Sequence, residues 1–192
     1  MNAPAPVLRL LVCGNADRGD DGAALCAVAH VLPSLDAAVS RQLEIRRCSQ
    51  LDATDIIDIP EGEACLILDT VVGVGAGEVV ELSLDALIDR PSIAPRSSHA
   101  LPIGQVLGIA RAVRGDLPDG RFVGIGGKWF GFGDVRSRAL REGMPAYEQA
   151  IAAAIHEQLG ARPVAPPTGP TGPSLGATRP FARSVRSPTI RT

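Results

Sequence analysis

Residues 64–69 read Ala-Cys-Leu-Ile-Leu-Asp, an unbroken apolar run that ends in a carboxylate. Such a run is typical of a strand that is buried on both faces of a sheet. A second apolar run, Val-Leu-Arg-Leu-Leu-Val-Cys, occupies residues 7–13 and leads into Gly-Asn at residues 14–15. Because glycine and asparagine favour turns, we expect this strand to feed directly into a loop. Both strands indicate a sheet with helices on its two faces.

Helical periodicity alternates with further strand patterns over most of the chain. Strands are also predicted at residues 43–47, 78–84 and 121–125, and helices from residue 20 to 32 and at 52–58, 103–113 and 137–159. A glycine-rich loop is expected at 73–77, and a proline-bearing loop from 85 to 99. The alternation predicts an α/β three-layer sandwich, in which a mostly parallel twisted sheet of about five strands is flanked by helices on both faces.

The composition indicates one globular domain followed by a different kind of segment. The chain has 192 residues, of which 45% are hydrophobic and 21% charged, the balance of an ordinary globular protein. We assign residues 1–162 to the α/β domain. Residues 163–192 are rich in Pro, Gly, Ser, Thr and Arg. We expect them to form a disordered tail, because they hold too little apolar surface to offset the entropy lost on ordering.

Charge and hydropathy argue against several classes of protein. The formal net charge is -2 and no basic stripe with interleaved aromatic residues is present, so nucleic acid is a poor candidate partner. No apolar run approaches the roughly 20 residues of a membrane span, and the N-terminus lacks a secretory signal pattern. We therefore expect a cytoplasmic protein without membrane insertion. The four cysteines are widely spaced, which favours buried thiols over disulfides or a zinc site.

Acidic and imidazole groups occur where the predicted strands end or a helix begins. Asp20 and Asp21 follow the first strand, Asp69 closes its own strand, and His99 precedes a helix. Ligands of α/β sheets bind outside the carboxyl ends of the strands, so these groups can gather on one rim. Carboxylates and an imidazole suit a divalent metal with open coordination positions. Structural roles stay open as alternatives to metal binding. An Asp at the end of a strand often caps a helix, which is the expected role of Asp20, and a single His is often only a packing residue.

Four segments, taken in order, resemble the signatures of the nickel–iron hydrogenase maturation proteases. They are Gly-Asn-Ala-Asp-Arg-Gly-Asp-Asp-Gly at 14–22, Leu-Ile-Leu-Asp at 66–69 with the glycine loop after it, Ser-Ser-His at 97–99 before a helix, and Phe-Val-Gly-Ile-Gly at 122–126 before a Gly-rich loop and the last helix. Together they span roughly residues 7–160. One segment departs from the family: residues 46–52 read Arg-Arg-Cys-Ser-Gln-Leu-Asp, where relatives often carry an Asp-Gly motif. Asp52 is expected to cap a helix there rather than to replace that motif.

The resemblance implies an endopeptidase that removes the C-terminal extension of a hydrogenase large-subunit precursor after nickel insertion. It implies that Asp21, Asp69 and His99 are the catalytic and metal-contacting residues. Nickel would be supplied by the precursor, and another divalent metal is an alternative occupant of the same site. Asp20 is the adjacent alternative to Asp21 and a weaker candidate for a general base. The expected partner is the nickel-loaded precursor, and a monomer is expected.

Two other functions remain open at this stage. The chain could escort the same hydrogenase subunit without cutting it. It could instead bind a nucleotide, since a strand, a glycine turn and a helix open such modules. Against that reading, the G-x-G-x-x-G fingerprint is absent after Gly14, and the carboxylates at the helix start would repel a pyrophosphate. No predicted strand leads into a G-x-S-x-G nucleophile elbow, and the chain contains no H-E-x-x-H motif.

Overall fold

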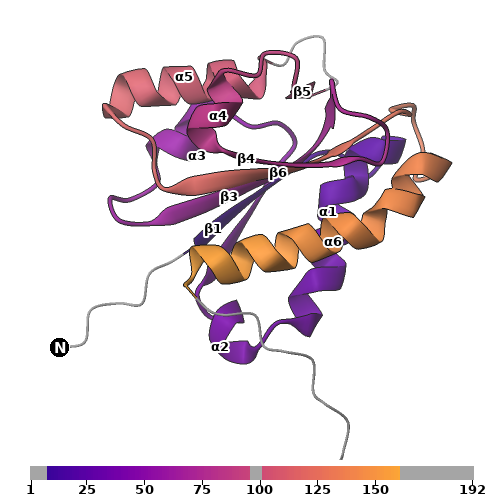
Figure 1. Cartoon of the computed structure of the whole chain (residues 1–192), viewed down its shortest axis with the longest axis horizontal. Coiled ribbons are helices and arrows are strands. Elements are labelled where there is room, and N and C mark those ends of the chain that lie inside the picture. The colour runs from indigo at the N-terminus through magenta and orange to yellow at the C-terminus, as the bar shows by residue number, and fades with distance from the viewer. Residues whose placement is uncertain (1–7, 96–100, 161–192) are drawn as a thin grey trace, which may run out of the picture.

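A six-stranded, mostly parallel sheet forms the centre of the computed structural model, which describes residues 8–95 and 101–160 (Figure 1). The strand order is β2-β1-β3-β6-β4, and the short β5 pairs with β3. The β1–β2, β1–β3 and β3–β6 pairs are parallel, whereas β4–β6 and β3–β5 are antiparallel. The bounds are β1 Leu8–Cys13, β2 Leu43–Cys48, β3 Ala64–Val72, β4 Val79–Ser83, β5 Ala94–Pro95 and β6 Gly120–Gly126.

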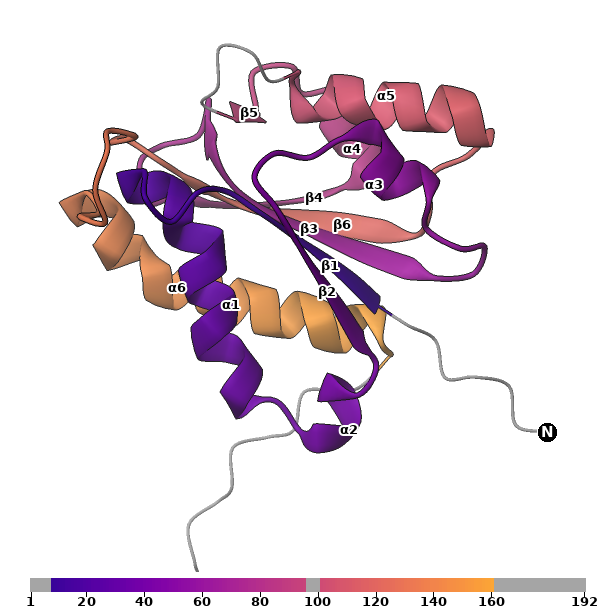
Figure 2. The same ribbon diagram turned by 180° about the vertical axis from the view of Figure 1, so that it is seen from behind.

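Helices cover both faces of this sheet, as Figures 1 and 2 show from opposite sides. One face carries α1 (Ala23–Val31) and α6 (Arg138–Gln158), with the short α2 (Ala37–Ser40) beyond α1. The other face carries α3 (Ala53–Ile57), α4 (Leu84–Ile88) and α5 (Ile103–Arg114). Two 3₁₀ turns, η1 (Gly19–Gly22) and η2 (Leu32–Ser34), flank α1. The predicted three-layer α/β architecture is confirmed.

The hydrophobic core is divided into two clusters, one on each face of the sheet. Successive side chains of β1 point to opposite faces, so Leu10 joins the cluster beneath α1 and α6, and Leu11 joins the cluster beneath α3 and α5. Tyr147 of α6 is fully buried in the first cluster, and Phe122 of β6 in the second. Burying each such large side chain contributes about 1.5–3 kcal/mol, so both helix layers are needed to stabilise the central strands.

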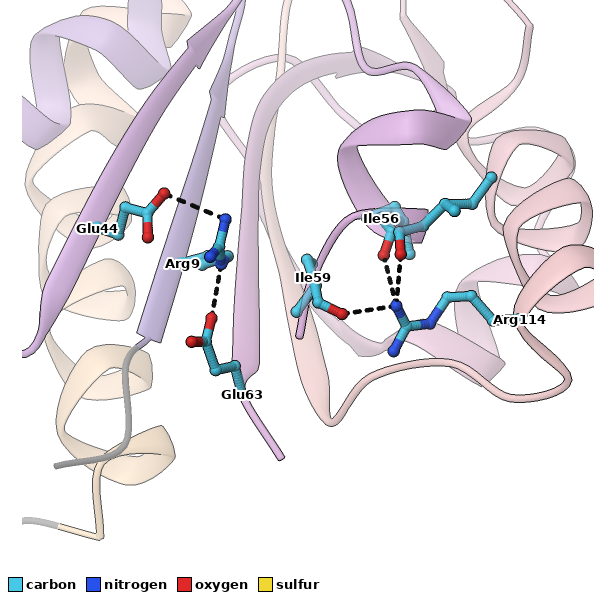
Figure 3. Close-up of polar contacts among 7 residues, drawn as sticks. Arg9, Glu44, Ile56, Ile59, Glu63 and Arg114 are labelled. Carbon is cyan, nitrogen blue, oxygen red and sulfur yellow. Dashed lines mark hydrogen bonds and ion pairs between the residues drawn. The ribbon is translucent and has the colours of Figure 1, made fainter. Parts of the chain in front are cut away.

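Arg9 connects the three strands at the amino-terminal edge of the sheet (Figure 3). Its guanidinium lies 3.1 Å from the Glu44 carboxylate of β2 and 2.7 Å from the carboxylate of Glu63, which precedes β3. Because Arg9 itself belongs to β1, these two ion pairs reinforce the parallel order of β2, β1 and β3.

Arg114, the last residue of α5, holds the end of α3 against α5 (Figure 3). Its Nη1 donates to the backbone carbonyls of Ile57 at 2.7 Å and Ile59 at 2.6 Å, and more weakly to that of Ile56 at 3.3 Å. These carbonyls lie at the carboxyl end of a short helix, where they have few partners within the helix. Arg114 therefore donates hydrogen bonds to carbonyl groups that would otherwise lack a partner between the two helices.

The structure corrects two of the predicted boundaries. β3 continues to Val72, so Asp69 lies within the strand rather than at its end. The reason is tertiary, because β6 pairs with β3 as far as Val71, and β5 pairs with Val71 and Val72. The segment expected as a loop from 85 to 99 also contains α4 and β5, which are too short to show periodicity in the sequence.

The expected cap of α3 is confirmed, and the ends of two other helices are defined locally. Asp52 caps α3 through a reciprocal capping box with Asp55. Gly115 ends α5 with a φ of 91°, a left-handed conformation that favours glycine. Ser137 caps α6, and Pro145 lies inside that helix rather than at its start. No helix within residues 8–95 and 101–160 is long and apolar enough to cross a membrane. The predicted tail at 163–192 lies outside the described residues.

Candidate functional site

The loop that follows β1 presents the first of the predicted carboxylates, Asp21. Gly14 comes directly after β1 and has a φ of 124°. A Cβ at this position would lie only 2.0 Å from the backbone oxygen of Asp21, so glycine is required for the loop to fold back over the strand end. The backbone N–H of Asn15 then donates to Oδ2 of Asp21 at 2.9 Å. The carboxylate is thereby held at the carboxyl end of β1.

The second carboxylate, Asp69, is buried in the neighbouring strand β3. Val12 of β1 pairs with Leu68 of β3, so Asp69 reaches the same edge of the sheet as the start of the Asp21 loop. Its side chain is anchored by the backbone N–H of Thr70, which donates to Oδ1 at 2.7 Å. The buried Tyr147 hydroxyl donates to the Asp69 carbonyl at 3.4 Å, which helps to fix the backbone. Only 4% of Asp69 is exposed.

The two carboxylates influence each other electrostatically. Burial raises the pKa of Asp69 to about 8; the Thr70 N–H opposes this rise, and the charge on Asp21 adds to it. Burial also raises the pKa of Asp21, against the opposing effects of the Asn15 N–H and the Arg18 charge. Because the Asp21 charge disfavours ionisation of Asp69, a cation bound at both carboxylates would stabilise their charged forms.

This pair lies where open α/β sheets bind ligands. β1 is flanked by β2 on one side and β3 on the other. The chain therefore leaves β1 in one direction and later returns to its other side, which makes the β1–β3 boundary a switch point. Asp21 follows one of these strands, and Asp69 lies towards the carboxyl end of the other. The sequence prediction that both carboxylates share one rim is in agreement with this placement.

The third predicted site residue, His99, lies outside the described residues. The described chain before it ends at Pro95, which pairs with Val71, two residues beyond Asp69, and the chain resumes with Leu101 before α5. Within the ranges that the structure describes, no group of three or more His, Cys, Asp or Glu side chains is arranged to hold a metal ion. Participation of His99 beside Asp21 and Asp69 therefore stays a prediction.

Asp20 has a role that the sequence did not reveal. The side chain does not cap the adjacent helix as expected; the residue before α1 is Gly22, which makes no side-chain cap. Instead the fully buried carboxylate accepts backbone N–H groups from Lys128 and Trp129, both at 2.8 Å, and from Ser137 at 2.6 Å. Burial alone would raise its pKa, but these donors outweigh burial and lower it. With its oxygens so occupied, Asp20 is poorly suited to the weaker suggested role of general base.

The same contacts fasten the aromatic loop at residues 127–137 beside the Asp21 loop. The N–H of Gly19 donates to the Gly133 carbonyl at 2.7 Å, and the N–H of Asp20 to the Trp129 carbonyl at 2.8 Å. The Arg18 guanidinium lies 4.5 Å from the centre of the Phe132 ring, within the range of a cation–π interaction. The only sequence signal for this association was the presence of large aromatic residues in a glycine-rich loop.

The remaining candidate groups are structural or lie on the surface. Cys13 is buried, and its hydrogen bond with Cys48, together with burial, raises the pKa of its thiol well above the ordinary value, so it is a poor nucleophile. All four cysteines are free, and Cys26 is only partly buried. His30 is exposed and lies 2.7 Å from the Glu148 carboxylate, so it is a surface residue.

Comparison with solved structures identifies the same fold in several hydrogenase maturation proteases. The hydrogenase-maturating endopeptidase HybD from E. coli has a TM-score of 0.62 and 18% identity, over 79% of this chain and 93% of that protein. The [NiFe] hydrogenase maturation protease HybD from Thermococcus kodakarensis has a TM-score of 0.52 and 23% identity, over 77% and 99%. The endopeptidase HycI from Escherichia coli has a TM-score of 0.54 and 20% identity, over 77% and 90%.

Sequence comparisons give no corresponding match: no protein-family model and no curated protein matches the chain. The structural likeness confirms, at the level of the fold, the resemblance that the sequence motifs indicated. It covers nearly the full length of each of these proteases, so the fold of the described region is that of a whole maturation protease.

Proposed function

We propose that this chain is an endopeptidase that removes the C-terminal extension of a nickel–iron hydrogenase large-subunit precursor once nickel has been inserted. The proposal is supported by a fold shared with proteins that are named as hydrogenase maturation proteases. The observation that carries it is the pair of interacting carboxylates, Asp21 and Asp69, at the switch point of the sheet. By resemblance to the family, His99 would be the third group of the site.

The protonation of this pair suggests how a metal in the substrate is recognised. With a pKa of about 8, Asp69 holds a proton at neutral pH when no cation is present. A divalent ion carried by the precursor would displace that proton and contact both carboxylates, because metal ligands must be deprotonated. An empty precursor offers no such ion. The carboxylate pair would therefore discriminate loaded from empty substrate.

The location of the pair suggests what the bound ion would do. The rim at the ends of β1 and β3 holds the acidic groups, and the Arg18 charge and the Asn15 N–H oppose the rise in the Asp21 pKa that burial causes. A nickel ion held here by precursor thiolates and enzyme carboxylates would bring the precursor's C-terminal segment to the same rim. The ion can then polarise the scissile carbonyl or activate a water molecule, the two usual roles of a metal in hydrolysis.

The decisive experiment compares nickel-loaded with metal-free precursor. The purified chain is incubated with each form, and the intact mass of the precursor is followed over time. We expect loss of a C-terminal peptide from the loaded precursor alone. Asp21→Asn and Asp69→Asn should block the mass loss, whereas Asp85→Asn, a change at an exposed carboxylate on α4, should leave it unchanged.

The two other functions predict different results from the same samples. An escort would bind the loaded precursor without changing its mass. A nucleotide-binding module would respond to a dinucleotide and ignore the precursor. Equal trimming of empty and loaded precursor would contradict recognition through the metal.

A further inference from the structure

We propose that the aromatic loop at residues 127–137 is a docking surface for the substrate, and that it receives an apolar precursor segment bearing carboxylates. The inference rests on the proposed function and adds to it a place and a chemistry for binding outside the metal site. The reasons are the exposure of the loop, its rigid attachment to the site, and its charge.

The loop exposes large apolar side chains to an unusual degree. Phe132 is 82% exposed, Val135 68% and Trp129 54%, and they lie within seven residues of one another. Elsewhere in the described part of the chain, the exposed large apolar residues are the single positions Ile45 and Leu101 and the pair Ile109 and Val113, which lie one turn apart on α5. Clustered exposed apolar side chains mark interaction sites, and Trp and Phe are residues that anchor protein interfaces.

The loop is held rigidly next to the proposed metal site. The buried Asp20 carboxylate binds three of its backbone N–H groups, and two further backbone bonds join Gly19 and Asp20 to the loop carbonyls. Asp21, the next residue, carries the candidate ligand. A polypeptide contacting the loop would therefore lie close to the carboxylate pair, with little entropy lost in ordering the surface that receives it.

One side chain connects the docking surface to the site directly. The Arg18 guanidinium lies over the Phe132 ring at 4.5 Å, and its charge also acts on the Asp21 carboxyl. Contact of a substrate with Phe132 would thus occur beside a cation that already belongs to the site. This continuity favours the substrate, rather than an unrelated protein, as the occupant.

The charge of the loop indicates the chemistry of the occupant. The loop and the first turn of α6, residues 127–142, contain one lysine and three arginines against one aspartate and one glutamate, so this segment is basic in a chain whose net charge is -2. Arg141 donates to the Arg136 carbonyl and Arg136 to the Gly22 carbonyl, and neither pairs with a carboxylate among the residues that the structure describes. Of these four cations, only Arg138 has an acidic partner within the described part of the chain, Glu142 at 2.8 Å. Carboxylates on the incoming segment would complement these cations.

A hollow beside the loop gives the apolar part of that segment a place to bind. It has a volume of about 550 Å³ and is lined by Lys128, Trp129, Ser137, Arg138, Ala139 and Glu142. The Trp129 ring and the Ala139 methyl supply apolar walls, and Lys128 lies at the same hollow. A hydrophobic side chain followed by a carboxylate matches this combination of groups.

The test measures trimming of nickel-loaded precursor over a range of concentrations by Phe132→Ala, Trp129→Ala and Lys128→Gln. We expect KM to rise about tenfold for each aromatic variant, the effect of losing an interface anchor, with kcat within about twofold of wild type. Lys128→Gln should raise KM less and reduce its dependence on salt. The matched control is Val113→Ala, which removes an apolar side chain 65% exposed on α5, on the other face of the sheet; its KM should be unchanged.

Several outcomes would overturn the inference. Phe132→Ala is the safer variant for folding, because its ring is largely exposed, so an unchanged KM for it would reject the docking surface whatever Trp129→Ala does. An equal rise in KM for Val113→Ala would also reject it. If the wild-type chain binds the precursor but does not trim it, equilibrium binding replaces KM. Weaker binding by Phe132→Ala would then support the docking surface while the proteolytic function fails.

Discussion

The charge of Asp21 raises the pKa of the Asp69 carboxyl, although 47 positions of sequence lie between the two residues. The parallel pairing of β1 with β3 places both groups at one edge of the sheet. Asp21 is held by the Asn15 N–H and Asp69 by the Thr70 N–H, so each carboxylate keeps one oxygen bound to its own loop or strand. Replacing either residue should therefore change the electrostatic interaction between the two carboxylates without breaking the hydrogen bond that holds the other one.

Substitution of either carboxylate should abolish trimming of the loaded precursor. Asp21→Asn and Asp69→Asn each remove a negative charge from the proposed nickel contact while keeping the shape of the side chain. We expect the trimming rate to fall by at least about 100-fold. Removing a residue that only hydrogen-bonds to a metal ligand already costs up to about 100-fold, and the residues replaced here are the proposed ligands themselves. His99→Ala should have the same effect on the basis of the family resemblance. Rates are measured by intact mass, and full processing by all three variants would remove the site assignment.

The free energy of unfolding should fall as the pH rises towards 8 in the metal-free protein. Asp69 has a folded pKa of about 8 against an ordinary value of 3.8. The contribution of Asp69 to the free energy of unfolding is therefore fully present below about pH 4, where Asp69 is protonated in the unfolded chain as well. This contribution is lost as the pH rises through 8. Between these values the free energy of unfolding falls by up to about 1.4 kcal/mol per pH unit.

Asp69→Asn tests this dependence, because an amide has no proton to lose over that range. Both proteins are unfolded in urea at pH 5.5, 6.5 and 7.5 with a chelator present. The free energy of unfolding of the wild type, relative to that of Asp69→Asn, should fall by up to about 2.7 kcal/mol over these two pH units. Asp21 is present in both proteins and largely cancels. Parallel pH profiles for wild type and variant would show that Asp69 is ionised in the native state.

Asp20→Asn should destabilise the protein more than Asp21→Asn does. The buried carboxylate of Asp20 accepts hydrogen bonds from three backbone N–H groups of the loop. In the variant, the NH₂ group of asparagine would face N–H donors instead of accepting from them. We expect a loss of about 2–3 kcal/mol, typical of a buried hydrogen-bonding group left unsatisfied. Chemical denaturation measures both variants. Equal stability of the two would mean that the carboxylate does not hold the aromatic loop.

Arg114→Met should lower the stability by about 2 kcal/mol, because the carbonyls of Ile57 and Ile59 lose a charged donor. For a chain of this size that corresponds to a fall in Tm of about 4–8 °C. Arg111→Met on the same helix is the matched control. Arg111 makes only an exposed ion pair with Asp85, at 3.5 Å, so its replacement should change the stability by less than about 0.5 kcal/mol. Similar Tm values for the two variants would contradict the anchoring role of Arg114.

Local sequence determined most of the secondary structure, because the relevant forces act between residues that are close along the chain. The apolar runs at β1 and β3, the periodicity of α5, the Asp52 cap and the glycine at the end of α5 are all such features. The placement of Asp21 after β1 and Asp69 towards the end of β3 followed from the same reasoning once the strands were assumed parallel. The family motifs added the expectation that these two carboxylates act together.

Tertiary structure alone decided the partners of the polar groups. Asp20 reads as a helix cap in the sequence, yet its hydrogen-bond donors Lys128, Trp129 and Ser137 are more than 100 residues away. The length of β3 depends on β5 and β6, and the raised pKa of Asp69 depends on burial by the layers around it. Periodicity and motifs record what each residue prefers. Hydrogen bonding, burial and charge coupling depend on distances that exist only after the chain has folded.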